Sequence, residues 1–359
     1  MKSVIFTAQE HDIHFNLATE AYLMQSLPSD TRALFLWVND PTVVIGRYQN
    51  PFIECNLPAM ERDGVKLARR FSGGGAVYHD AGNLCFTFIC PKDEYDKEDN
   101  FRIITSALDS LGIEADVSGR NDIVACGAKI SGNAFQIKGG MACHHGTLLV
   151  DCDLSRLPSY LTPDRTKLEI HGVKSVVSRV RNISDIRPGI TADDIKGSII
   201  RAFTAASGGD CATEILNKET LLKDEYFRTT YGKLSSAEWN LGMTPRFKDL
   251  LRGRNKDGGF AFRLDVDHAV ITAADVSGDA LDTERDGRAS EDSARPPLRP
   301  RRNQGPGKRK EPLRKRGPFA ACGSDLRGSE QSEFEIMEAV RHGRVAVGRE
   351  IHLSVVEGE

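Results

Sequence analysis

Arg69-Arg70-Phe71-Ser72-Gly73-Gly74-Gly75-Ala76-Val77-Tyr78-His79-Asp80 places three consecutive glycines between two short apolar segments. Glycine adopts positive φ at little cost, so successive backbone N–H groups can turn inward and form a concave anion site. Arg70 would add a positive charge at the mouth of this loop. Residues 66–71 and 76–78 have the composition of strands, and residues 79–83 are typical of a turn into another buried strand. An anion-binding loop and a plain connection between strands are both compatible with this pattern.

The loop differs from a Walker A motif, which requires Gly-x-x-x-x-Gly-Lys-Ser/Thr ahead of a helix. Here Gly75-Ala76-Val77 leads into a strand. The glycines therefore do not indicate a P-loop fold.

The overall composition sets the class of protein. A chain of 359 residues with 40% hydrophobic residues has room for two domains with a real core. Its formal charge of -3 indicates no general preference for nucleic acid or membrane, and no apolar run approaches the roughly 20 residues of a membrane span. Its eight cysteines lack a paired short spacing such as Cys-x-x-Cys, which is typical of free thiols in a reducing compartment. We expect a cytoplasmic protein.

Several segments have clear periodicity or capping signals. The apolar runs predict strands at residues 4–7, 34–38, 42–45, 113–117 and 141–150, with Asn39-Asp40-Pro41 as a hairpin connection between the second and third. Helical spacing predicts helices at residues 16–27, capped by Asn16, and 100–111, capped by Asn100 and ended by Gly112. Short helical pieces are expected at residues 154–161 and 166–170, and Thr191 with Asp194 predicts a capping box.

Residues 141–150 carry Cys143, His144 and His145 in one predicted strand. Side chains alternate between the faces of a strand, so Cys143 and His145 should point to one side and His144 to the other. This alternation argues against a metal site made of the two adjacent histidines. A histidine in a strand is also compatible with a hydrogen-bonded core position.

The glycine loop resembles the Arg-Arg-Phe-Ser-Gly-Gly-Gly-Ala-Val-Tyr-His-Asp-x-Gly-Asn signature of the lipoate–protein ligase A family. Other motifs match in the family's order over about residues 1–282, and they include residues 15–20, 42–51, 118–122, 129–134 and 144–149. The resemblance implies an α+β fold, a mixed α/β biotin/lipoyl-ligase-like catalytic domain, over residues 1–245. It also implies a small accessory C-terminal domain that begins within residues 246–282, with two antiparallel strands expected at residues 260–265 and 270–276.

The resemblance implies an ATP-dependent ligase that activates lipoate to lipoyl-AMP with release of pyrophosphate. The lipoyl group then passes to a lysine of a lipoyl domain in a 2-oxo-acid dehydrogenase E2 subunit or of a glycine-cleavage carrier protein. ATP with Mg2+ is the implied co-substrate and lipoate the acyl substrate. No nucleic-acid or membrane partner is expected.

The resemblance also assigns site residues. Lys129 matches the family's essential lysine and is the candidate catalytic residue. The positions that match the lipoate pocket are Glu20, Trp37, Cys143 and His145. The positions that match the ATP and lipoyl-AMP site are Arg70, Ser72, Gly73, Gly74, Gly75, Ala76, Val77, Tyr78, His79, Asn83, Asn121, Asp122 and Lys129. No metal ligand is assigned firmly, and Asp122 is the nearest candidate for the Mg2+ that accompanies ATP.

Simpler interpretations of single residues stay open. A lone lysine is usually a solvated charge, Trp37 could be a core residue, and residues 118–122 could be only a turn. Lys129 lies beside the small residues Ser131 and Gly132, which would let a ligand approach. A cation there would offset the repulsion between a carboxylate and an α-phosphate, by about 4 kcal/mol at roughly 4 Å and an effective dielectric near 20. Cys143 replaces a residue that is more often aromatic in the family, so the preference between lipoate and octanoate stays open.

The chain departs from the family after about residue 282. Residues 295–316 hold ten Lys and Arg residues, one acid and five prolines, and such a segment cannot bury enough surface to offset its ordering entropy. We therefore expect residues 283–359 to form a divergent, basic, Pro-rich and disordered tail, either natural or the product of a disrupted reading frame, with a short helix at residues 334–340.

Three other functions are compatible with the sequence. A lipoyl or octanoyl transferase that does not use ATP would need a cysteine nucleophile, and Cys143 is the cysteine nearest the motifs. A biotin-type ligase would share the architecture. A non-catalytic protein that binds lipoate or nucleotide would explain the altered C-terminal region. The physiological acceptor and the oligomeric state do not follow from the sequence.

Overall fold

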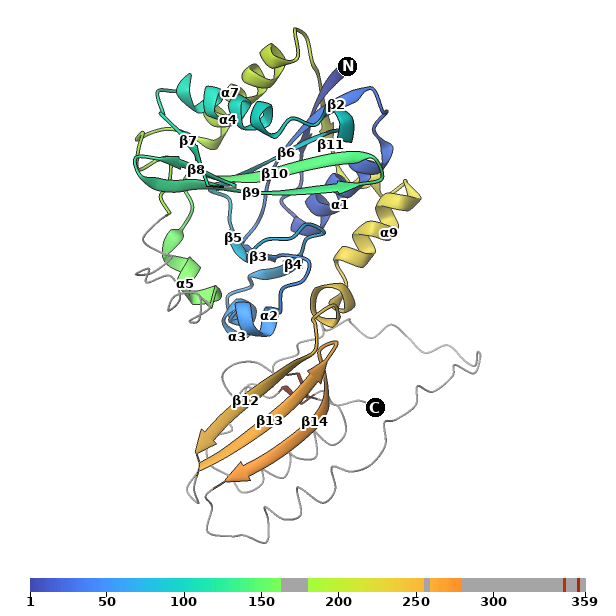
Figure 1. Cartoon of the computed structure of the whole chain (residues 1–359), viewed down its shortest axis with the longest axis vertical. Helices are drawn as coiled ribbons and strands as arrows, with labels where there is room; N and C mark the ends of the chain where they lie inside the picture. Colours follow the sequence, from blue (N-terminus) through green and yellow to red (C-terminus); the bar gives the residue numbers. More distant parts are fainter. Residues whose placement is uncertain (120, 163–179, 255–258, 279–344, 347–353, 356–359) are drawn as a thin grey trace. The chain divides into compact units, whose positions relative to one another are not determined.

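The computed structural model describes residues 1–119, 121–162, 180–254, 259–278, 345–346 and 354–355 (Figure 1). The chain divides into two compact units, Met1–Met243 and Thr244–Glu359. Among the described residues, no helix combines the length and the apolar character that crossing a membrane requires.

The first unit is built on a mixed sheet with the strand order β11-β1-β2-β6-β10-β9-β8-β7. Strand β1 is parallel to its neighbours β2 and β11, and the pairs from β2–β6 onward are antiparallel. The strands are β1 (Lys2–Ala8), β2 (Thr31–Val38), β6 (Asn83–Pro91), β7 (Asp116–Ser118), β8 (Asp122–Ala125), β9 (Ala128–Lys138), β10 (Met141–Leu149) and β11 (Ala212–Leu216). With the helices described next, this sheet confirms the predicted α+β class.

Helices cover both faces of this sheet. Helices α4 (Lys97–Asp109) and α7 (Ala192–Ala206) pack together on one face, while α1 (Ile13–Ser26) and α9 (Glu225–Leu234) pack together on the other (Figure 1). Side chains of one strand alternate between the two cores. Leu34 and Leu36 lie in the α4/α7 core, and Phe35 and Trp37 lie in the α1/α9 core.

A smaller sheet with the order β4-β3-β5 carries the glycine loop. Its strands are β3 (Thr42–Ile45), β4 (Lys66–Arg69) and β5 (Val77–His79), and the glycine loop connects β4 to β5. Val43, Ile45, Tyr78 and Tyr160 share a third apolar core beside it. The described residues of this unit also form the short helical elements α2 (Pro51–Glu54), α3 (Leu57–Arg62), η1 (Lys92–Glu94), η2 (Leu154–Arg156), α5 (Leu157–Tyr160), α8 (Lys218–Leu221) and the π-helix η4 (Glu238–Gly242).

Two predicted helix caps are wrong. Helix α1 is capped by Asp12, whose carboxylate accepts the N–H of His14, and Asn16 lies fully buried within the helix. Helix α4 is capped by Asp96, and Asn100 is buried, with its Oδ1 accepting a hydrogen bond from Arg32 at 2.7 Å. Asparagine is a preferred helix cap. Here, however, each asparagine side chain bonds to residues outside its own helix and lies inside the helix. The capping box of Thr191 and Asp194 is confirmed.

The predicted hairpin at residues 39–41 is also wrong. Strand β2 pairs with β1 and β6 in the large sheet, whereas β3 pairs with β4 and β5 in the small one. Asn39 is fully buried between them and accepts a hydrogen bond from Asn16 Nδ2 at 3.0 Å. The turn residues therefore carry the chain from one sheet to the other. The strand predicted at residues 113–117 begins only at Asp116.

The second unit contains a three-stranded antiparallel sheet of β12 (Phe247–Arg254), β13 (Gly259–Asp267) and β14 (Val270–Gly278). The strands predicted at residues 260–265 and 270–276 are thereby confirmed, and β12 was not predicted. Farther along, β15 (Val345–Ala346) pairs with β16 (Ser354–Val355). Several predictions lie outside the described residues: Arg120, the helices at 166–170 and 334–340, and almost all of the tail at 283–359.

Candidate active site

The glycine loop is held from beneath by Arg70. The Arg70 guanidinium donates to the carbonyls of Gly73 and Gly75 from Nη2, both at 2.8 Å, and to Val44 from Nη1 at 3.2 Å. Arg70 was predicted to place its charge at the mouth of the loop. The residue is only 7% exposed, so this prediction is wrong. Burial lowers the pKa of Arg70 to about 10, which still leaves it charged at neutral pH. Arg70 therefore shapes the loop.

The loop has room for a ligand above it. Gly73 and Gly75 are exposed, and a Cβ built on either would meet no atom within 4 Å. Gly74 differs, because its φ is +101° and a Cβ there would lie 2.6 Å from Arg70 Nη2. Gly46, the residue after β3, lies against the loop, and a Cβ built on it would lie 2.2 Å from the Gly74 carbonyl oxygen. The open glycines fit the backbone cradle that a nucleotide phosphate requires.

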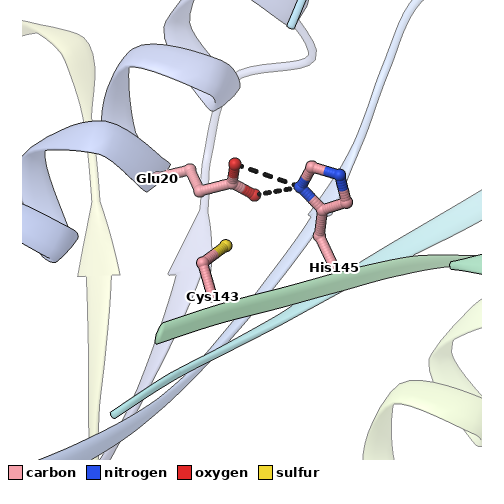
Figure 2. Close-up of side chains that lie close together, drawn as sticks. All are labelled: Glu20, Cys143 and His145. Atoms are coloured by element: carbon pink, nitrogen blue, oxygen red, sulfur yellow. Dashed lines mark hydrogen bonds and ion pairs between the residues drawn. The ribbon is translucent and has the colours of Figure 1, made fainter. Parts of the chain in front are cut away.

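A chain of hydrogen bonds connects the loop to the interior. Ser72 Oγ accepts from Arg70 Nε at 3.1 Å and lies 2.9 Å from His145 Nε2. The other ring nitrogen of His145, Nδ1, lies 2.9 Å from Glu20 Oε2 (Figure 2). Three elements thus contribute: the loop supplies Ser72, β10 supplies His145, and α1 supplies Glu20. The buried Glu20 carboxylate is stabilised by an imidazole donor in place of water.

Trp37 is the innermost member of this series of hydrogen bonds. Trp37 Nε1 donates to Thr87 Oγ1 at 3.1 Å, and Thr87 Oγ1 donates to Glu20 Oε2 at 3.0 Å. Trp37 is only 5% exposed and stacks on Phe35. It is therefore both a core residue and a part of the polar cluster, and the two sequence interpretations are not exclusive. Thr87 was not predicted, because a threonine inside an apolar strand gives no signal.

Cys143 and His145 lie on one face of β10, as the alternation predicted (Figure 2). His144 faces the opposite core, where its Nε2 lies 3.0 Å from Asn133 Oδ1 and its ring packs on Phe135. Burial lowers the pKa of His144 to about 3. Burial also raises the pKa of the Cys143 thiol well above its usual range, and the neighbouring Glu20 carboxylate adds to the effect.

Lys129 forms an ion pair with Asp122, with Nζ 2.7 Å from Oδ1. Both side chains are about one-third exposed. A Cβ built on Gly132 would lie 3.2 Å from Lys129 Nζ, so the ammonium lies over the face of β9 on which Gly132 and Gln136 lie. Gln136 contacts Met24 of α1, so this is the α1 face of the sheet, on which Cys143 and His145 also lie. The lysine is therefore near this surface and free to exchange its partner.

Asn121 is held against the middle of β9, beside this pair. Its Nδ2 donates to the carbonyl of Asn133 at 2.9 Å, and its own carbonyl accepts from the backbone N–H and the side chain of Asn133. The side chain is thus engaged with the protein backbone. Its amide and the neighbouring Asp122 still lie at the exposed edge, where a nucleotide could reach them.

The remaining predicted nucleotide residues lie deeper. His79 is buried, and its Nδ1 accepts from Asn39 Nδ2 at 2.9 Å. Burial, with Arg70 and His145 as additional causes, lowers the pKa of His79 to about 3. Asn83 is fully buried and donates to Cys85 Sγ at 3.2 Å. Tyr78 points into the third core against Tyr160, where burial raises its pKa to about 12.

Arg69 belongs to the glycine-loop motif in the sequence, and in the structure it also has partners far along the chain. It is fully buried, and its guanidinium donates to the carbonyls of Arg47 and Gln49 at 2.9 and 2.6 Å. It also donates to the carbonyls of Trp239 and Asn240 in η4 at 3.0 and 2.8 Å. Arg69 thus joins the segment beside the glycine loop to the end of the first unit. No local pattern could have revealed a partner 170 residues away.

Most of the predicted residues outside the glycine loop form two groups on one side of the large sheet, and Tyr78, His79 and Asn83 belong to neither. The first is the buried cluster of Glu20, Trp37, Ser72, Cys143 and His145 under the glycine loop. The second is the exposed edge of Asn121, Asp122 and Lys129. Among the described residues, no side-chain hydrogen bond or ion pair joins the groups directly. Together they offer an apolar floor with a polar end, an open backbone cradle and an accessible ammonium.

The chain is similar to a known protein family and to several solved structures. The family described as lipoyl protein ligase A/B catalytic domain matches residues 12–204, which is more than half of the chain. The structure of P. falciparum LipL1 in complex with lipoate is 31% identical, with a TM-score of 0.60, over 80% of this chain and 88% of that one.

Two further structures are similar. A bi-partite lipoate protein ligase from Thermoplasma acidophilum, studied with its E2 lipoyl domain, is 27% identical with a TM-score of 0.60, over 69% of this chain and 99% of that one. A lipoate-protein ligase A bound with ATP is 28% identical with a TM-score of 0.58, over 68% of this chain and all of that one.

Proposed function

Because the chain belongs to the lipoyl protein ligase A/B catalytic-domain family, we propose that it is an ATP-dependent, AMP-forming lipoate–protein ligase. One observation supports this function most strongly. The ammonium of Lys129 and the buried polar cluster around His145 lie over the same face of one sheet, beside an open glycine loop. An acyl chain, its carboxylate and a nucleotide could therefore meet on that face.

The first step joins lipoate to ATP. A carboxylate oxygen of lipoate attacks the α-phosphorus, the bond to the bridging oxygen of the β-phosphate breaks, and pyrophosphate leaves. Both reactants are negative, so a cation near the attacking and α-phosphate oxygens lowers the barrier. Lys129 is exposed enough to move from Asp122 to these oxygens. Such a contact is worth about 4 kcal/mol at roughly 4 Å, or about three decades of rate if it acts only in the transition state.

The glycine loop would hold the nucleotide. Gly73 and Gly75 offer open backbone, and Arg70 fixes the carbonyls so that the opposite side of the loop stays available. Asp122 is the carboxylate that could bind Mg2+ together with ATP, in keeping with the preference of Mg2+ for one or two carboxylates and phosphate oxygens. Bound Mg2+ would neutralise phosphate charge. Asp122 would then give up Lys129 to the reacting groups.

The buried cluster would hold the acyl chain. A chain of about eight carbons gains roughly 0.8 kcal/mol for each buried methylene, so an apolar slot beside Trp37 and Cys143 provides useful affinity. Both residues belong to the α1/α9 core. Glu20 and His145 place polar atoms beside this apolar slot. Cys143 leaves more space in the slot than an aromatic residue would.

The second step transfers the acyl group to a protein. The amine of an acceptor lysine attacks the activated carbonyl, AMP leaves, and an amide forms. Lipoyl domains of 2-oxo-acid dehydrogenase E2 subunits and glycine-cleavage carrier proteins are the proposed acceptors, and the Thermoplasma acidophilum ligase studied with its E2 lipoyl domain supports this class. We assign catalysis to residues 1–245, since every proposed site residue lies between Glu20 and His145. The seven described cysteines are free, which agrees with a cytoplasmic enzyme.

A transferase that does not use ATP is the second candidate. It would need a reactive cysteine, and Cys143 is the cysteine in the cluster. Its thiol pKa is raised by burial and by Glu20, which is the opposite of an activated nucleophile. This observation favours the ligase over the transferase.

The test uses purified protein, ATP, Mg2+, lipoate and an apo lipoyl domain. AMP release and the mass of the acceptor are followed together. We expect both to rise, and each to require ATP and lipoate. Acceptor modification only from a preformed acyl donor would indicate the transferase, and tight binding of lipoate without AMP release would indicate a non-catalytic binder.

A further inference from the structure

Glu20, Cys143 and His145 bring three different metal-ligating groups to one point. A carboxylate oxygen, the thiol sulfur and an imidazole nitrogen all lie within 4.8 Å of one another (Figure 2). Cys143 and His145 are two residues apart on β10, so both point to the α1 face, and Glu20 approaches from α1. Two of the three groups therefore come from one strand and the third comes from the facing helix.

The surroundings of these groups fit a metal centre. In metal sites a histidine commonly donates its second ring N–H to a nearby acceptor, and a ligating carboxylate is itself hydrogen-bonded. His145 Nε2 lies 2.9 Å from Ser72 Oγ, and Glu20 Oε2 accepts from Thr87 Oγ1 at 3.0 Å. With Nδ1 bound to an ion, Nε2 would carry the proton and donate to Ser72. Both supporting contacts are already formed.

We propose that Glu20, Cys143 and His145 form a three-ligand site for Zn2+, with the fourth tetrahedral position open. Sulfur, nitrogen and carboxylate oxygen together match the ligands of Zn2+ better than those of Mg2+, which takes oxygen alone. Binding releases the thiol proton to solvent and replaces the hydrogen bond between Glu20 and His145 by two metal bonds. A thiolate and a carboxylate neutralise the ion, so the buried site carries no net charge.

Zn2+ at this position would occupy the polar end of the acyl pocket. This consequence, unlike the binding itself, rests on the proposed lipoate ligase function. The ion would exclude the acyl chain from this part of the pocket. The ligase would therefore lose activity as Zn2+ fills the site. Cys143 is the residue that provides the sulfur, so a chain with an aromatic residue there would lack the site.

Cobalt titration of the full chain tests the site directly. Co2+ substitutes for Zn2+ and gives a near-ultraviolet sulfur-to-cobalt charge-transfer band with visible bands of tetrahedral coordination. We expect one equivalent of Co2+ to give this spectrum, and one equivalent of Zn2+ to bleach it, since Zn2+ binds such ligands more tightly than Co2+. A folded wild-type protein without the charge-transfer band would overturn the proposal, whether or not the protein is an active ligase.

Matched variants identify the ligands. Cys143→Ser should abolish the charge-transfer band, and Glu20→Gln should keep the sulfur band but weaken Co2+ binding by at least about tenfold. Cys126→Ser is the control, because Cys126 is exposed in the turn between β8 and β9 and should leave the band unchanged. Circular dichroism establishes that each variant is folded. A band that survives in folded Cys143→Ser, or that disappears in Cys126→Ser, would refute the assignment. Zn2+ that binds but leaves an active ligase uninhibited would refute the blocking role.

Discussion

Glu20 and Lys129 serve the same face of one sheet in opposite surroundings. Glu20 is 5% exposed and contacts His145 and Thr87, whose hydroxyl also accepts from Trp37. Lys129 has one ion-pair partner among the described residues, and its side chain is 36% exposed. The buried cluster is therefore fixed by folding, whereas the lysine can change partners when a substrate arrives. Substitutions in the first region should affect stability, and those in the second should affect catalysis alone.

Lys129→Ala gives the largest expected separation of the two regions. Loss of the ammonium should slow lipoyl-AMP formation by about three decades. The exposed ion pair with Asp122 contributes no more than about 1 kcal/mol, so the midpoint of thermal unfolding should hardly change. Single-turnover AMP release and a melting curve measure the two effects. Lys92→Ala, at an exposed lysine of η1, is the control and should retain both properties. A normal rate in Lys129→Ala would remove the lysine from its proposed role.

Thr87→Val tests the buried region. The valine leaves Trp37 Nε1 without its buried hydrogen-bond partner, while Glu20 Oε2 keeps only His145 Nδ1. An unpaired buried donor costs about 1–3 kcal/mol, so we expect a fall of at least about 1 kcal/mol in the free energy of unfolding, measured in urea. Thr213→Val, at an exposed position of β11, should change it by less than about 0.5 kcal/mol. Equal stability of the two variants would mean that the hydrogen bonds of Thr87 do not stabilise the buried cluster.

Gly74→Ala tests how the glycine loop is shaped. Gly74 has a φ of +101° and a Cβ there would meet Arg70, whereas Gly73 has open space. We expect Gly74→Ala to lower the free energy of unfolding by about 1–2 kcal/mol through backbone strain, and Gly73→Ala to change it much less. Thermal unfolding compares the two variants. A larger loss for Gly73→Ala would contradict the role of Arg70 beneath the loop.

Acid should destabilise the buried region gradually, through His79. Burial lowers the pKa of His79 to about 3, so the unfolded chain binds a proton below about pH 6.5 while the folded protein does not. Stability should therefore fall as the pH drops from about 6.5 toward 3, by at most about 1.4 kcal/mol per pH unit for this group. His79→Gln should show a shallower slope in urea unfolding between pH 6 and 4. The same slope in both proteins would mean that His79 does not stay neutral in the folded state.

Local pattern predicted most of the large sheet, because apolar runs and alternation act within one strand. The placement of Cys143 and His145 opposite His144 is the best example. The caps failed, since Asn16 and Asn100 have partners on distant strands that their own helices do not reveal. The turn at Asn39 failed because the neighbouring strands join different sheets.

The chemistry of the site depended more on tertiary structure. Ser72 and His145 lie 73 residues apart, and their contact sets the orientation of both. Arg70 was expected at the mouth of the loop, but loop carbonyls draw its guanidinium inside. Sequence motifs therefore named residues of which several lie close together in the structure, and only the structure separates the buried ones from the exposed ones.

Lipoate-dependent exchange of labelled pyrophosphate into ATP, without any acceptor protein, tests the central claim most directly. Exchange reports reversible formation of lipoyl-AMP and nothing later. The account predicts exchange that requires lipoate and Mg2+ in the wild-type protein and is lost in Lys129→Ala. A folded wild-type protein that binds lipoate but gives no exchange would contradict the claim that this sheet face activates a carboxylate with ATP.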